Sequence, residues 1–279
     1  MHASSVFFPA LCASVLAAPV YPDLNLKAAL PDDAMKDLSQ YFNMLAQKTK
    51  EGRQMSWAPT CDMSAAKLPV ASPQALPDVT PGLILKHVAV GRGTQNYTCD
   101  TTNTTAAPTA AGAVATLFNA SCIAGAYPDL LNMLPRVSMA FNLSSAPSPG
   151  PGAAPIKNLL PTSSNSRLAP GNYVISGHHY FTDSTTPYFN LDTDALKLGT
   201  IPCAKDAAVP APDGAPKGQL GEKAVPWLKL SAKSGATGRL QEVYRVETAG
   251  GSAPSTCSGM PASFEVEYSA QYWFFESAS

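Results

Sequence analysis

Charged residues are scarce in this chain, and neither sign is in excess. Lys, Arg, Asp and Glu together make up 14% of its 279 residues, and the formal net charge is −1. Soluble domains usually carry about 25% charged residues. A nucleic-acid-binding protein needs a basic surface stripe, and an electrostatic membrane anchor needs a cluster of Lys and Arg. The composition therefore argues against both classes, and we expect no nucleic-acid partner.

Long apolar runs are missing after the N-terminus, so we expect no membrane span, which would need ~20 apolar residues. Residues 1–18, in contrast, contain an apolar stretch from Val6 to Ala18 that ends in small residues. This pattern predicts a secretory signal peptide, although the segment lacks the Lys or Arg usual at its start. The alternative is a buried N-terminal segment.

Cysteine spacings typical of zinc sites are absent as well. The chain has six Cys, none in a C-x-x-C pair or a Cys/His cluster. Removal of the leader would also remove Cys12 and leave an odd number. In an oxidising compartment the remaining cysteines form disulfides by default. One thiol then stays free or pairs between chains, and the residues alone do not fix the connectivity.

N-glycosylation sequons agree with secretion and bear on one strand. They occur at Asn96, Asn103, Asn119 and Asn142. The first lies in GTQNYTC (93–99), which has the composition of a strand. Because neighbouring strand residues alternate sides, an outward Asn96 places Gln95, Tyr97 and Cys99 on the inward face.

Extended segments dominate the chain. Strand patterns cover residues 82–91, 93–99, 112–120, 172–181, 226–232, 240–248 and 263–275. We therefore predict a mainly β, single-domain fold, either a β-sandwich or a barrel, over residues 61–279. Long Pro/Gly-rich loops are expected at 144–155 and 204–223.

Helical patterns are few. Residues 19–60 form an N-terminal segment with one amphipathic helix, in which Met35, Leu38, Phe42 and Leu45 recur at helical spacing. A weaker helix is expected from Pro128 to Leu134, where Pro135 should end it.

Several strings resemble a known family. They are HVAVGRGTQNYTC (87–99), AVPWLKL (224–230), EVYRVETAGG (242–251) with PSTC (254–257), and EVEYSAQYWFF (265–275). The chain is similar, from about Cys61 to its C-terminus, to a secreted fungal family built on a domain of unknown function, which has bacterial relatives. The resemblance implies the disulfides Cys99–Cys257 and Cys61–Cys122, with Cys203 left as the odd thiol. It implies no activity.

Members of this family are often labelled malate dehydrogenase by automated naming, and the residues argue against that label. A dinucleotide site needs G-x-G-x-x-G between a strand and a helix. In GRGTQN (91–96), Asn96 replaces the third glycine, and β-branched residues follow where a helix should begin. We therefore reject NAD-dependent malate dehydrogenase activity and expect no NAD cofactor.

The best catalytic candidate is His179. Within the pair 178–179, the family pattern G-x-H-[YF]-F favours His179, and Asp183 and Asp192 lie nearby in sequence as acid–base or orienting partners. A single metal ion held by His179 and His87 is an alternative with no specific spacing to support it. No other cofactor is expected.

Candidate ligand-binding residues are polar groups on inward faces and one aromatic residue. Gln95 and Tyr97 either line a polar pocket or bond to backbone groups and fix strand register. Lys229 and Arg245 either join them in a groove or belong to a solvated face. Trp273 is either a core residue or a platform for a sugar ring.

These observations predict a secreted glycoprotein, extracellular or associated with the cell wall, that binds a small or carbohydrate ligand. One alternative is a carbohydrate-active or metal-dependent enzyme that uses His179 with a nearby Asp. The other is a structural or interaction protein of the wall. Whether the chain is an enzyme stays open at this point.

Overall fold

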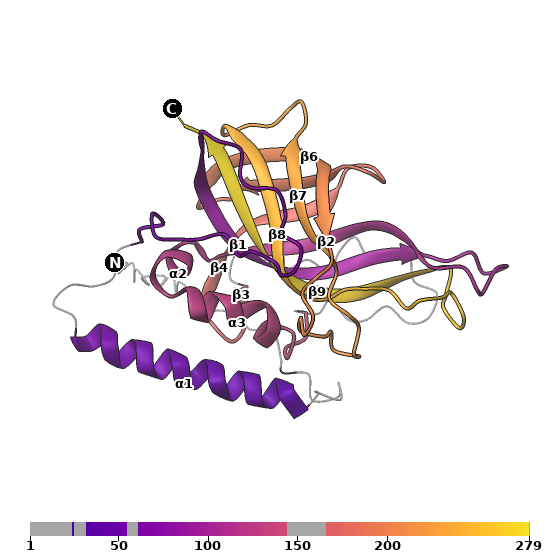
Figure 1. Ribbon diagram of the computed structural model, residues 1–279, viewed down its shortest axis with the longest axis horizontal. Coiled ribbons are helices and arrows are strands. Elements are labelled where there is room, and N and C mark those ends of the chain that lie inside the picture. The colour runs from indigo at the N-terminus through magenta and orange to yellow at the C-terminus, as the bar shows by residue number, and fades with distance from the viewer. Residues whose placement is uncertain (1–23, 25–31, 55–60, 144–165, 279) are drawn as a thin grey trace, which may run out of the picture.

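The structure is a computed structural model that describes residues 24, 32–54, 61–143 and 166–278 (Figure 1). The expected signal peptide and the loop at 144–155 lie outside these residues. The helices are α1 (Asp32–Gln54), α2 (Ser121–Ala126) and α3 (Pro128–Ser138). The strands are β1 (Leu83–Thr98), β2 (Thr109–Asn119), β3 (Arg167–Leu168), β4 (Tyr173–Phe181), β5 (Pro187–Asp192), β6 (Lys197–Val209), β7 (Trp227–Ala232), β8 (Leu240–Gly250) and β9 (Ser263–Ser277).

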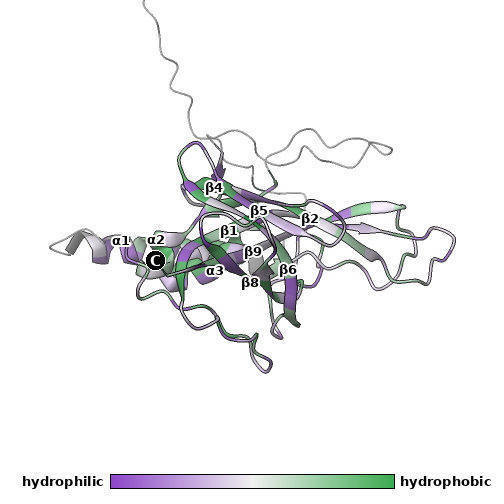
Figure 2. Cartoon of the chain, turned by 90° about the horizontal axis from the view of Figure 1, so that it is seen from above, coloured by the Kyte–Doolittle hydropathy of each residue, from purple (hydrophilic) through white to green (hydrophobic). Residues whose placement is uncertain are grey.

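The strands form one antiparallel sheet that closes on itself. Their order is β2-β1-β9-β8-β7-β6-β5-β4-β3, and β2 also pairs with β4. That pairing makes a barrel of every strand except β3. In Figure 2, β4 lies on one side of the molecule and β8 on the other, as their opposite places in this order require. The mainly β prediction is confirmed, and of its two forms the barrel is the one observed.

The barrel separates two hydrophobic cores. Its interior is filled by side chains of alternate strand positions, with Phe189, Tyr268, Tyr272 and Phe274 among the largest. Barrels of about eight strands are just wide enough to be filled in this way or to hold one small ligand. The second core lies on the outer face, where α2 and α3 pack on β1 and α1 packs on α3 (Figure 1).

Helix α1 buries a different face from the expected one. Leu38 and Leu45 do pack against the outer core, but Met35 and Phe42 are exposed. Tyr41 is the most buried residue of the helix, and its hydroxyl lies 3.2 Å from that of Tyr173. The prediction considered only Met, Leu and Phe positions. It missed Tyr41, which faces inward and pairs with the partly buried Tyr173.

Helix α3 continues through Pro135 to Ser138, so the predicted stop at this proline was wrong. A proline in a helix leaves the carbonyl four residues earlier without its N–H donor. Here that carbonyl belongs to Leu131, and the Nε2 of Gln271 on β9 donates to it at 3.3 Å. The sheet thus replaces the missing hydrogen bond and permits the longer helix.

Sequence patterns also missed β5 and β6. The segment expected to be a loop from residue 204 is strand up to Val209. Pro202 lies inside β6, and prolines argue against strands that have neighbours on both sides. Ala204, Lys205 and Asp206 are exposed, so this half of the strand lacks the alternation that would reveal it.

Both expected disulfides are present. Cys61–Cys122 ties the segment before β1 to α2, and Cys99–Cys257 ties the end of β1 to the β8–β9 connection. Cys203 is a free thiol buried in the barrel interior. The pairing implied by the family resemblance is therefore confirmed.

Candidate functional site

Strand β1 directs Gln95 and Tyr97 into the barrel. Gln95 is paired with Ala113, which belongs to the interior core, and cross-strand partners share a face. The Tyr97 hydroxyl donates to the carbonyl of Gly251 at 2.8 Å. The Nε2 of Gln95, in contrast, is buried without a hydrogen-bond partner. The hydroxyl of Tyr97 is therefore satisfied by the backbone, whereas the side-chain N–H₂ group of Gln95 is left without an acceptor.

Arg245 is a buried cation in the same interior. It follows the interior residue Val243 by two positions on β8 and is 8% exposed. Its Nη2 donates to the carbonyl of Pro226 at 2.9 Å, and its Nε is buried without a partner. No carboxylate of the described residues lies within 4.0 Å of its guanidinium. A buried charge without a counter-ion is costly, so this arrangement needs an explanation.

Two tyrosines complete the polar cluster. The hydroxyls of Tyr268 and Tyr272 are 2.8 Å apart, and both side chains are fully buried. Burial raises the pKa of both hydroxyls, while the nearby Arg245 acts in the opposite sense. Both hydroxyls are therefore neutral at neutral pH and do not compensate the charge of Arg245. Sequence reasoning missed this pair, although the spacing Y-x-A-x-Y from 268 to 272 puts both on one strand face.

His179 also faces the interior, where it is neutral. Its Nδ1 donates to the carbonyl of Tyr188 at 3.1 Å, and its ring stacks on Phe189 with centroids 4.2 Å apart. Burial, with a smaller contribution from the charge of Arg245, lowers its pKa to about 3. At neutral pH the imidazole therefore presents Nε2 as an acceptor and is not a general acid.

The two aspartates predicted to act with His179 are engaged elsewhere. Asp183 accepts hydrogen bonds from the backbone N–H and hydroxyl of Thr185 in the exposed β4–β5 turn, which lowers its pKa to about 2. The Oδ1 of Asp192 accepts from the backbone N–H of Gly199 at 2.9 Å. The described residues contain no interaction between His179 and either carboxylate, and the acid–base arrangement is not assembled.

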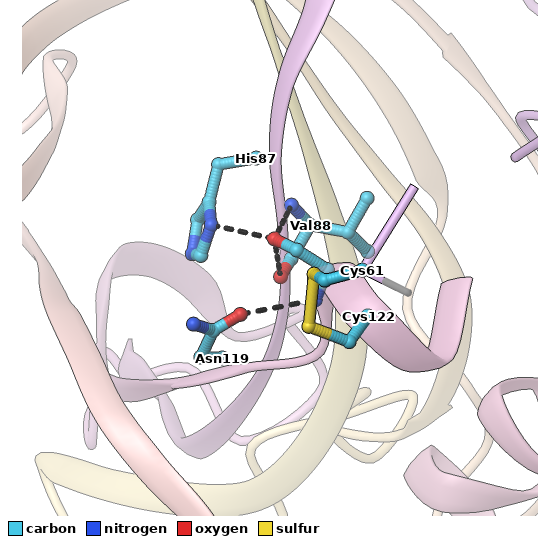
Figure 3. The surroundings of a disulfide bond; sticks show 6 residues. Cys61, His87, Val88, Asn119 and Cys122 are labelled. Carbon is cyan, nitrogen blue, oxygen red and sulfur yellow. Dashed lines mark hydrogen bonds between the residues drawn. A yellow bond between two sulfur atoms is a disulfide. The ribbon is translucent and has the colours of Figure 1, made fainter. Parts of the chain in front are cut away.

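His87 has different hydrogen-bond partners from His179. Its Nδ1 is 2.8 Å from the hydroxyl of Ser121, and its Nε2 is 2.9 Å from that of Ser176. In Figure 3 the dashed line from His87 marks its hydrogen bond to Ser121, the residue that precedes Cys122 of the Cys61–Cys122 disulfide.

The rings of Phe274 and Phe189 lie between His87 and His179. The ring centroid of Phe274 is 6.0 Å from that of His87 and 5.5 Å from that of Phe189, which stacks on His179. Across the described part of the chain, no group of three or more His, Cys, Asp or Glu could hold a metal ion. The structure therefore does not bring together the metal ligands suggested by the sequence.

Two of the suggested ligand-binding residues lie on the outer face of the barrel. The Nζ of Lys229 is 3.0 Å from the Oε1 of Glu242 and donates to the carbonyl of Asp78 at 2.7 Å. Trp273 is 2% exposed in the outer core, and its indole N–H donates to Gln271 at 2.9 Å. The residues that do meet inside are Gln95, Tyr97, His179 and Arg245 together with Tyr268 and Tyr272, and we call them the interior polar cluster.

The sequons differ in their surroundings. Asn103 is exposed in the β1–β2 connection, whereas Asn96, Asn119 and Asn142 are partly exposed. The Oδ1 of Asn119 accepts from the backbone N–H of Ser121 beside the Cys61–Cys122 disulfide (Figure 3). Glycosylation stays a prediction at all of them, and Asn103 is the most accessible acceptor.

Comparison with known proteins gives one match. A family described as a protein of unknown function, DUF3455, matches residues 80–276, which span the barrel from β1 to β9. No curated protein matches the chain, and no solved structure does.

Proposed function

The chain belongs to the DUF3455 family of proteins of unknown function, and we propose that it is an extracellular binding protein for a small ligand that carries a carboxylate group. The ligand reaches the interior polar cluster at Gln95 and Tyr97, its two partly exposed members. Its carboxylate pairs with Arg245, and its other polar groups meet the hydroxyls of Tyr268 and Tyr272.

The observation that carries this proposal is the buried guanidinium of Arg245, which has no counter-ion among the described residues. Its Nε and the Nε2 of Gln95 are buried donors without acceptors. Nearly all buried polar groups in proteins have hydrogen-bond partners, so two orphan donors in one interior indicate a missing acceptor. A carboxylate is the group that a guanidinium binds best, because two parallel N–H donors match its two oxygens.

The neighbouring residues support an anionic ligand over a cationic one. His179 is neutral at neutral pH, and the tyrosines are protonated donors. The interior therefore holds one positive charge and several hydrogen-bond donors. A cation in this position would be repelled by Arg245 and would leave the orphan donors unpaired.

An extracellular location is supported by the two disulfides, because such bonds persist in oxidising compartments. The N-terminal signal pattern and the exposed sequon at Asn103 agree with it. Among the described helices, none is long and apolar enough to cross a membrane.

The test is isothermal titration calorimetry with matched pairs of charged and neutral compounds. Benzoate and succinate are the probes, and benzamide and succinamide are their uncharged controls. We expect a carboxylate to bind and its amide to bind at least tenfold more weakly. Arg245→Gln should weaken carboxylate binding by at least tenfold, because it removes the charge-assisted hydrogen bonds.

Arg239→Gln is the matched control variant, since Arg239 is exposed and pairs with Glu276 outside the cluster. It should bind as the wild type does. Absence of binding to either carboxylate, equal binding of the amides, or full binding by Arg245→Gln would each refute the proposal.

A further inference from the structure

A cavity lies outside the barrel, bounded by α1, α3 and residues 212–216. Its volume is about 330 Å³. Gln40 contributes from α1, Asn132 and Arg136 from α3, and Trp227 and Glu247 from the barrel wall. Small-molecule sites begin at about 300 Å³, so this cavity has the size of one small ligand. None of its residues belongs to the interior polar cluster.

Glu247 is held in the cavity by a strained backbone. Its φ is 48°, in the left-handed region that residues other than glycine rarely adopt. The strand register shifts between Val246 and Ala249, so Glu247 sits in a bulge. In a regular strand Glu247 and Arg245 would lie on the same face. The bulge moves Glu247 out of that face. Strain of this kind costs about 1–3 kcal/mol and clusters at functional sites.

The carboxylate of Glu247 has no partner among the described residues. Arg136 lines the same cavity, but its Nη1 binds the Oδ1 of Asp37 at 2.9 Å, and no ion pair joins it to Glu247. Burial raises the pKa of the Glu247 carboxyl, and the charge of Arg136 acts in the opposite sense. Glu247 is therefore a half-buried acceptor open to the cavity.

Trp227 supplies an unsatisfied donor in the same wall. Its side chain is 2% exposed, and its indole N–H is buried without an acceptor. A buried tryptophan N–H usually finds a partner, so this group also indicates a missing ligand atom. The residues that line the cavity thus include an acceptor without a donor, on Glu247, and a donor without an acceptor, on Trp227.

We infer that this cavity binds a neutral, hydroxyl-rich ligand of the size of a monosaccharide. A sugar hydroxyl donates to the carboxylate of Glu247, and a second hydroxyl oxygen accepts from the indole of Trp227. An amine would bind the carboxylates of Glu247 and Asp213 but would leave the indole N–H of Trp227 without an acceptor and would meet the charge of Arg136. An anion would satisfy only the indole and would be repelled by Glu247. Only a group that both donates and accepts completes the site.

The test is a titration monitored by ¹⁵N NMR of the tryptophan indole groups. The probes are D-glucose, D-galactose, D-mannose and N-acetyl-D-glucosamine, each added to the full-length protein. Trp227→Phe keeps the ring and identifies the Trp227 signal by its loss. We expect a saturable shift of that signal with at least one sugar. Isothermal titration calorimetry, which does not depend on the Trp227 signal, should show binding at least tenfold weaker in Trp227→Phe and in Glu247→Gln.

Glu265→Gln is the matched control. Glu265 is another half-buried glutamate with a raised pKa, on β9 and outside the cavity, so its variant should bind sugar normally. Glu247→Gly separates function from fold, because glycine adopts a positive φ without strain. It should raise the melting temperature and abolish the sugar-induced shift.

Two kinds of result would contradict the inference that this cavity binds a sugar. If none of the four sugars shifts the Trp227 signal, the inference is wrong. It is equally wrong if Glu247→Gln or Glu247→Gly binds sugar as tightly as the wild type. Carboxylate binding through Arg245 is measured with other probes and other variants, so failure of either proposal leaves the other standing.

Discussion

The ring of Tyr272 fills the space that a side chain at Gly91 would occupy. A Cβ at Gly91 would lie 2.5 Å from the Tyr272 ring and 3.2 Å from Leu117. The stretch GRGTQN thus has a packing role within β1, which runs unbroken from Leu83 to Thr98. The residues that resemble half of a nucleotide-binding loop instead admit a large aromatic side chain to the barrel interior.

Gly93 gives the sharpest test of this packing. A Cβ there would lie 1.9 Å from the carbonyl oxygen of Val114, so the β1–β2 pairing must shift to admit it. We expect Gly93→Ala to lower the free energy of unfolding by about 2 kcal/mol or more, as overpacking does. Urea denaturation measures the change.

Gly52→Ala is the control, because we expect it to raise the free energy of unfolding, whereas Gly93→Ala should lower it. Gly52 lies in α1, where a Cβ would meet only the Tyr127 hydroxyl at 3.9 Å. Gly52→Ala should stabilise the protein by about 1 kcal/mol through helix propensity. A Gly93→Ala variant as stable as the wild type would show that β1 and β2 are not in the close contact described.

His87 makes stability depend on pH. Burial lowers its pKa from 6.5 to about 4, so between these values the unfolded chain binds the proton and the folded chain does not. The free energy of unfolding should therefore fall as the pH falls through this window, by roughly 3 kcal/mol for this residue. His179, with a pKa of about 3, acts in the same direction to lower pH.

His87→Gln checks this linkage. The amide keeps a donor and an acceptor between the hydroxyls of Ser121 and Ser176 but does not titrate. Urea unfolding of both proteins at a series of pH values should give a shallower dependence for the variant between about pH 6.5 and pH 4. Parallel curves would mean that His87 is solvated in the folded protein.

Alternation and spacing allowed the sequence to predict the strands that have one clear apolar face. β8 and β9 were expected within a few residues of their observed ends. The interior position of Gln95 and Tyr97 followed from the alternation around Asn96. These predictions succeed because the strand period is two and depends only on local sequence.

What the sequence could not predict depends on contacts between distant segments. Gln271 replaces the hydrogen bond that Pro135 removes from α3, and the two are far apart in the chain. The bulge at Glu247 moves this residue out of the face that it shares with Arg245 in a regular strand. Barrel closure likewise rests on the pairing of β2 with β4, for which no local pattern exists.

Cys203 should resist alkylation in the native protein. Its thiol is buried in the barrel interior, and burial raises its pKa well above the ordinary value. Because the thiolate is the reactive form, iodoacetamide should not modify Cys203 until the chain unfolds. Mass spectrometry counts the adducts. Rapid modification of the folded protein would place Cys203 at an accessible surface.

Arg245→Met tests whether the unpaired charge is retained for binding and not for stability. Removing a buried cation that lacks a counter-ion, with a side chain of similar length, removes the cost of its desolvation. We expect the ligand-free variant to unfold at a higher urea concentration than the wild type, with a gain of about 1 kcal/mol or more. In the calorimetric assay the same variant should bind benzoate and succinate at least tenfold more weakly. If Arg245→Met is instead less stable than the ligand-free wild type, the hydrogen bond to the carbonyl of Pro226 makes Arg245 a structural residue. The barrel would then need no anion to complete it.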